Sequence, residues 1–112
     1  CASESGMAYQ VKSFFSRRYK AITEYKAVRN PQTGKWLRFD LFVYPNIFIE
    51  INGKQHYQYI PYFHRTYEKF KYQKHTYKIK KDFAKRSGIL IEIDLRKIRT
   101  LEQAIEYIEK RM

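Results

Sequence analysis

Two adjacent apolar runs, each containing one carboxylate, most constrain what this chain can fold into. Residues 38–57 read RFDLFVYPNIFIEINGKQHY, and a Tyr-Pro-Asn turn at 44–46 separates the runs. Asp40 lies in the first run and Glu50 in the second. Apolar runs on either side of a short turn predict a β-hairpin. A charge on a buried strand is costly unless something pairs with it, so the two carboxylates indicate a binding site.

The length of the turn decides whether the two carboxylates share a face of the sheet. A two-residue turn pairs Asp40 with Ile51 and puts the carboxylates on opposite faces. A three-residue turn pairs Asp40 with Glu50, and Asn46 tolerates the left-handed conformation that is common at the last position of such turns. The metal-site hypothesis requires the three-residue turn, because carboxylate oxygens are the ligands that Mg²⁺ prefers. The alternative is two carboxylates at a sheet edge, facing water or lysines.

The remaining pattern predicts one α/β domain of order αβββαβα. The expected elements are a helix at 4–18, strands at 22–29, 36–43 and 47–52, a long helix at 62–86, a strand at 89–93 and a helix from 101. The last three strands are apolar on both faces, so we expect helices to flank both sides of a central mixed four-stranded sheet, with 89–93 as an internal strand. We expect Gly88 to end the long helix as a left-handed cap. Residues 100–103 fit a capping box.

The charge of the chain favours a polyanionic partner. Lys and Arg number 23 against 11 Asp and Glu, which gives a net charge of +12, and nucleic acid is the commonest partner of so basic a domain. We expect phosphate contacts from Lys54, Arg17, Arg18, Lys74, Lys78 and Lys81. A solvated basic face with aromatic residues packed inward is the alternative for the long helix. No apolar run approaches the roughly 20 residues that span a bilayer, and one cysteine forms no internal disulfide, so we expect an intracellular protein without a membrane partner.

A polar cluster follows the second apolar run. Neutral His56 can take a proton from an attacking water or bind a metal ion, and Gln55 can orient water or substrate. Surface exposure without function is the alternative for a single loop histidine. Asp82 stands among lysines near the end of the long helix, either as a catalytic acid or as a salt-bridge partner. The sequence has no Cys/His zinc spacing, glycine-rich phosphate loop or serine nucleophile motif.

The element order, Asp40 on a strand, the block IEINGKQHY at 49–57 and the segment KDFAKRSGILIEI at 81–93 resemble the PD-(D/E)XK nuclease superfamily. Within it the chain is similar to the very-short-patch-repair branch, and especially to phage intron-encoded homing endonucleases whose site is described as EDxHD. The resemblance runs from the first helix to Ile93. It implies a restriction-endonuclease-like fold in which residues 1–112 are a single nuclease catalytic domain, part of a larger protein with a separate DNA-recognition region.

The resemblance also implies roles for single residues. They are the metal-binding aspartate Asp40, the strand acid Glu50, the histidine of the branch His56, the late aspartate Asp82, and the glutamate of the first helix, which is Glu4 or, on a predicted strand, Glu24. Asn52 stands where the family has a lysine. Charge neutralisation must then come from Lys54, His56 or another nearby group.

The implied function is that of a Mg²⁺- or Mn²⁺-dependent endodeoxyribonuclease acting on double-stranded DNA. Asp40 and Glu50 would hold the metal ion, which activates water and stabilises charge on the phosphate. A homodimer is one way to cut both strands. The resemblance places such a protein in the cytoplasm or nucleoid of a phage-infected bacterium. The alternatives are a non-catalytic basic module that binds nucleic acid, and a mismatch-nicking or junction-resolving nuclease.

Overall fold

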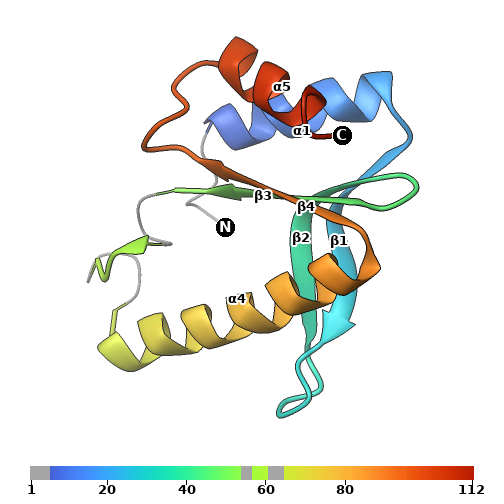
Figure 1. The fold of residues 1–112 in the computed structure, drawn as a ribbon. Helices are drawn as coiled ribbons and strands as arrows, with labels where there is room; N and C mark the ends of the chain where they lie inside the picture. Colours follow the sequence, from blue (N-terminus) through green and yellow to red (C-terminus); the bar gives the residue numbers. More distant parts are fainter. Residues whose placement is uncertain (1–5, 54–56, 61–64) are drawn as a thin grey trace.

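A central sheet with helices on both faces forms the molecule, in a computed structural model that describes residues 6–53, 57–60 and 65–112 (Figure 1). The elements are α1 (Gly6–Arg18), β1 (Ala21–Arg29), β2 (Trp36–Val43), β3 (Ile47–Asn52), α4 (Tyr67–Ser87), β4 (Ile89–Asp94) and α5 (Leu101–Glu109). Strands β1, β2 and β3 form an antiparallel meander, and β4 pairs with β3 in parallel. The predicted order αβββαβα and the mixed four-stranded sheet are confirmed.

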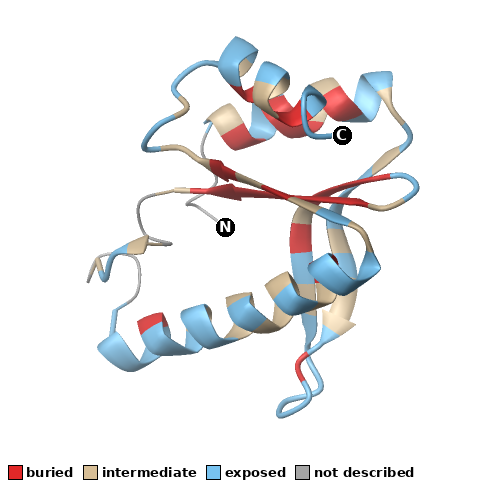
Figure 2. Ribbon diagram, in the orientation of Figure 1, coloured by how far each residue is buried: buried red, intermediate tan, exposed pale blue. Residues whose placement is uncertain are grey.

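Two apolar clusters lie on opposite faces of the sheet. Helices α1 and α5 cover one face, where their buried residues meet Leu41, Ile49 and Ile91. Helix α4 crosses the other face, where Ala84 packs near Phe48. Figure 2 shows that burial is concentrated in β3, all of whose residues are buried. Apolar residues on both faces of the strands therefore did predict cover on both sides.

The prediction that 89–93 is an internal strand is wrong. In the described residues the sheet order β1-β2-β3-β4 leaves β4 at an edge, with β3 as its one neighbour. Its apolar character has a different cause, because Ile91 and Ile93 face the α1 and α5 layer while Leu90 faces α4. Helices on two faces make a strand look internal in sequence even when one of its edges is free of strands.

Gly88 joins α4 to β4 without the left-handed conformation that we expected. Its φ of 173° and ψ of −135° are extended, and its backbone N–H donates to the carbonyl of Ala84. Glycine is required here for space, because a Cβ atom would overlap the carbonyl oxygen of Asn46. The turn at 44–46 also lacks the left-handed residue that was expected, because Asn46 does not have a positive φ. The Tyr44–Pro45 peptide bond in this turn is cis.

Helix α4 begins at Tyr67 rather than at 62, and most of its residues are partly or fully exposed. Thr66 caps it by accepting a hydrogen bond from the backbone N–H of Lys69. Phe70 and Ala84 are buried whereas Tyr67 is 51% exposed, so the aromatic residues of this helix pack inward only in part. In α5 the predicted capping box between residues 100 and 103 is confirmed. No helix in the described ranges has the length and apolar character needed to cross a bilayer.

Candidate active site

The turn between β2 and β3 brings the two carboxylates together. Val43 pairs with Ile47, so three residues form the turn, which is the length that the metal-site hypothesis requires. The same antiparallel register, continued along the strands, sets Asp40 opposite Glu50. Directly opposed residues share a face of a sheet. The geometric condition for a shared site is therefore met.

The carboxylates replace the regular ladder of hydrogen bonds between β2 and β3. The backbone N–H of Asp40 donates to Glu50 Oε1 at 3.1 Å. The backbone N–H of Ile51 donates to Asp40 Oδ2 at 2.7 Å. Two backbone donors thus hold the two acids in place where the strands separate, and a charged acceptor strengthens each hydrogen bond.

Lys80 on α4 supplies the positive charge at this site. Its Nζ atom lies 2.8 Å from Glu50 Oε2, and the lysine and glutamate side chains are 15% and 6% exposed. The ammonium group also lies 5.2 Å from the centre of the Phe39 ring. Sequence reasoning missed Lys80, because α4 carries several lysines and only the rotation of the helix on the sheet selects this one.

The two acids have raised pKa values. Burial raises the pKa of Glu50 to about 7; the charge of Lys80 opposes this rise and that of Asp40 adds to it. Burial also raises the pKa of Asp40, against the hydrogen bond from the Ile51 N–H and the charge of Lys80. A cation binding between the acids would therefore compete with protons near neutral pH.

A polar cavity of about 210 Å³ contains both carboxylates. Its lining comes from β2, from the end of β3 and from one side of α4: Asp40, Glu50, Ile51, Asn52, Gly53, Gln73, Thr76, Tyr77 and Lys80. This volume has room for several waters. Mg²⁺ binds through one or two carboxylates and keeps several waters, so the donor set fits a hydrated divalent cation.

A hydrogen-bond network closes the side of the cavity next to β4. The Asn52 amide donates to the hydroxyls of Tyr57 and Tyr77 at 3.5 and 3.4 Å. The Tyr77 hydroxyl in turn donates to Glu92, which is the partner of Glu50 in the parallel register. Asn52 thus orients tyrosines, while Lys80 reaches the acid from α4.

Glu24, one of the two candidates for the first glutamate, lies near Asp40. It accepts a hydrogen bond from the buried Lys12 at 3.1 Å and has an unusual φ of 52°. Its charge contributes to the raised pKa of Asp40. The other candidate, Glu4, and the expected site residues Lys54, Gln55 and His56 lie outside the described residues.

The structure does not bring Asp82 to the cavity. Asp82 is 51% exposed and pairs with Lys78 on the same helix at 3.3 Å. It follows Lys80 by two positions, which is about 200° around the helix, so the two side chains leave α4 on opposite sides. Its contacts are those of the salt-bridge alternative.

The five expected phosphate-binding residues that the structure describes fall into two groups. Lys74, Lys78 and Lys81 lie on α4, where Lys81 approaches Glu92 at 3.7 Å on the β4 side of the cavity. Arg17 and Arg18 end α1 on the opposite face of the sheet, near the turn at 44–46 (Figure 1). Neither group lines the cavity, and Lys81 comes near it through Glu92, which accepts the hydrogen bond from Tyr77.

Comparison with known proteins adds no relative. No family model matches the chain, and no curated protein or solved structure matches it either. Among the described residues no group of three or more His, Cys, Asp or Glu side chains is arranged to hold a metal ion. The Asp40–Glu50 pair therefore carries the functional argument, and the resemblance stays a prediction.

Proposed function

We propose that the chain is the catalytic domain of a metal-dependent endonuclease that hydrolyses phosphodiester bonds in double-stranded DNA. The observation that carries the proposal is the opposed Asp40–Glu50 pair in a polar cavity with Lys80. A net charge of +12 suits the polyanionic substrate. The sequence resemblance supports the same reaction. It also supports a location in the cytoplasm or nucleoid of a phage-infected bacterial host.

In this proposal Asp40 and Glu50 hold Mg²⁺ or Mn²⁺ through one or more of their carboxylate oxygens. When bound, the ion supplies a Lewis acid for the phosphate and a nucleophile from water. The N–H groups of Asp40 and Ile51 fix the orientation of the two acids. Lys80 favours the ionised form of Glu50, which is the form that binds a cation.

The basic side of α4 would position the DNA backbone next to the cavity. Lys74, Lys78 and Lys81 project from neighbouring turns on one side of this helix. Lys81 comes nearest to the cavity, 3.7 Å from Glu92. Such contacts fix the register of DNA without reading its sequence. Cutting both strands would then require two copies of the domain or two binding events.

A nicking assay on supercoiled plasmid tests the proposal. We expect nicking with Mg²⁺, none with EDTA, and a loss of at least about 100-fold in Asp40→Asn and in Glu50→Gln. Glu102→Gln makes the same chemical change at an exposed residue of α5 and should keep wild-type activity. Equal nicking by wild type and Asp40→Asn, or no nicking by wild type at any concentration, would refute the proposal.

The second candidate function is a nucleic-acid-binding module without catalysis. The ion pair between Lys80 and Glu50 favours it, because it neutralises the buried acid without a metal ion. Calorimetric titration with Mn²⁺ separates the two functions. Binding that is lost in Glu50→Gln supports the nuclease, and DNA binding without any uptake of Mn²⁺ supports the binding module.

A further inference from the structure

The β1–β2 hairpin carries a second concentration of positive charge, separate from α4. Residues 26–38 include Lys26, Arg29, Lys35 and Arg38 and no acidic residue. All four basic side chains are exposed. Figure 1 shows that this hairpin extends past α4, away from the layer of α1 and α5. A two-stranded ribbon of this kind has the width that fits into the major groove of DNA.

Two of these charges face each other directly across the strands. Lys26 and Arg38 are register partners in the β1–β2 ladder. Like charges at directly opposed positions destabilise a sheet. Neither side chain forms an ion pair within the part of the chain that the structure describes. An anion that bridges them would remove the repulsion.

An exposed aromatic ring lies near the end of the same hairpin. Trp36 is 45% exposed and is the register partner of Arg29. The guanidinium carbon of Arg29 lies 4.7 Å from the centre of the Trp36 ring, a cation–π arrangement. A large exposed aromatic ring beside an arginine is a surface suited to contact with sugars and bases, while the arginine reaches phosphate.

The position of the hairpin relative to the candidate site is defined by β2. Trp36 and Asp40 belong to one strand, four residues apart, which is roughly 13 Å along the strand. That length corresponds to about four base-pair steps of duplex DNA. On the side of α4 that faces the hairpin, the Tyr72 hydroxyl accepts a hydrogen bond from the buried Asn30 at 3.0 Å. This contact fixes the hairpin to α4.

We propose that the β1–β2 hairpin is a DNA-binding ribbon that contacts the duplex on one side of the cleaved phosphate. Lys26 and Arg38 together bind backbone phosphate, and Trp36 with Arg29 lies in the groove. The proposal rests on the proposed function, since it assumes duplex DNA at the Asp40–Glu50 site. It assigns that substrate a second contact region, which the basic side of α4 does not provide.

Trp36 makes the proposal directly measurable, because it is the only tryptophan in the chain. The experiment titrates Glu50→Gln protein with a short duplex of mixed sequence and records tryptophan emission and its quenching by acrylamide. We expect the emission to change and the acrylamide quenching to fall as DNA covers the ring. Unchanged emission and quenching at saturating DNA would overturn the proposal.

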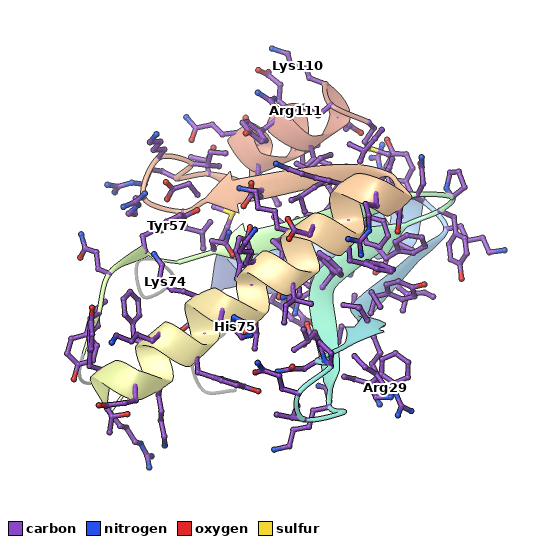
Figure 3. The ribbon with its side chains drawn as sticks, turned by 60° about the horizontal axis from the view of Figure 1, so that its bottom comes forward. Arg29, Tyr57, Lys74, His75, Lys110 and Arg111 are labelled. Atoms are coloured by element: carbon purple, nitrogen blue, oxygen red, sulfur yellow. The ribbon has the colours of Figure 1, made fainter. Side chains whose placement is uncertain are left out.

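A pair of matched double variants tests the charges. Lys26→Gln with Arg38→Gln should weaken duplex binding by about tenfold and reduce the slope of log affinity against log salt by about 2. Lys110→Gln with Arg111→Gln removes two charges at the end of α5, far from Arg29 in Figure 3, and should leave the slope unchanged. Equal losses in the two double variants would overturn the proposal. Thermal melting by circular dichroism shows that both variants fold.

Plasmid nicking by the wild-type protein separates this proposal from the proposed function. Nicking with Mg²⁺ but no change in Trp36 emission would refute the DNA-binding ribbon and support the nuclease. A change in Trp36 emission without any nicking would refute the nuclease and support the hairpin as a nucleic-acid contact.

Discussion

Lys80 and Glu50 form an ion pair of 2.8 Å across 30 residues of sequence, and it joins α4 to the centre of the sheet. The lysine is 15% exposed and the glutamate 6%, so neither charge is well solvated. Breaking a buried pair by removing one partner leaves the other charge without compensation. The stability of the domain and the ionisation of its candidate metal ligand therefore depend on one contact.

Replacing the lysine tests this dependence. Lys80→Met should raise the pKa of Glu50 further, lower the free energy of unfolding at pH 8 by about 3 kcal/mol and reduce nicking by about 100-fold. Carboxyl-selective NMR measures the pKa of Glu50, and chemical denaturation measures the free energy of unfolding. Lys85→Met, an exposed lysine of the same helix, is the control and should change stability by less than about 0.5 kcal/mol. A pKa of Glu50 that does not rise would contradict the prediction.

The buried acid also predicts how stability depends on pH. Because the pKa of Glu50 rises from 4.5 to about 7 on folding, the folded chain binds more protons than the unfolded chain in that window. The free energy of unfolding should therefore fall as pH increases from about 4.5 to 7, by up to about 3 kcal/mol from this group. Urea titrations at several pH values measure the slope.

The Glu50→Gln variant identifies the source of that slope. Its stability should lack the contribution of Glu50, while Glu102→Gln should retain it. A wild-type curve that parallels the Glu50→Gln curve across the window would show that Glu50 titrates normally.

Asp82 provides a test between sequence resemblance and structure. The resemblance gives Asp82 a site role, whereas the side chain pairs with Lys78 away from the cavity. From this position we expect Asp82→Asn to keep nicking within about twofold of wild type, because an exposed i, i+4 pair contributes little. A loss as large as that of Asp40→Asn would show that Asp82 acts in catalysis.

The tight contact between Gly88 and Asn46 predicts a stability effect. A methyl group at position 88 would overlap the Asn46 backbone, so Gly88→Ala should lower the free energy of unfolding by about 1–3 kcal/mol. Thermal denaturation measures the change. Ser87→Ala, at the neighbouring exposed position, should stay within about 0.5 kcal/mol. Equal stability of wild type and Gly88→Ala would show that the turn shifts at no cost.

Local patterns predicted the parts of the fold that depend on neighbours in sequence. The strands 36–43 and 47–52 were predicted with the same bounds that β2 and β3 have, because apolar runs and a turn define them. The sequence left the turn open at two or three residues, and the three-residue turn of the structure sets Asp40 opposite Glu50. The capping box of α5 is likewise a local pattern.

Features that depend on contacts distant in sequence were not predicted. The edge position of β4 follows from strand order, which periodicity does not reveal. The selection of Lys80 depends on how α4 rotates on the sheet, and the need for glycine at 88 depends on Asn46 in a different turn. Each of these results from packing between segments that sequence patterns treat separately.

The hydrogen bonds that orient the two acids give the site its own reporter. The backbone N–H groups of Asp40 and Ile51 donate hydrogen bonds to side-chain carboxylates rather than to backbone carbonyl groups of the neighbouring strand. Proton uptake or cation binding by these acids changes the acceptor strength that each amide experiences. The exchange rates and chemical shifts of two backbone amides should consequently follow occupancy of the cavity, without any label or substrate.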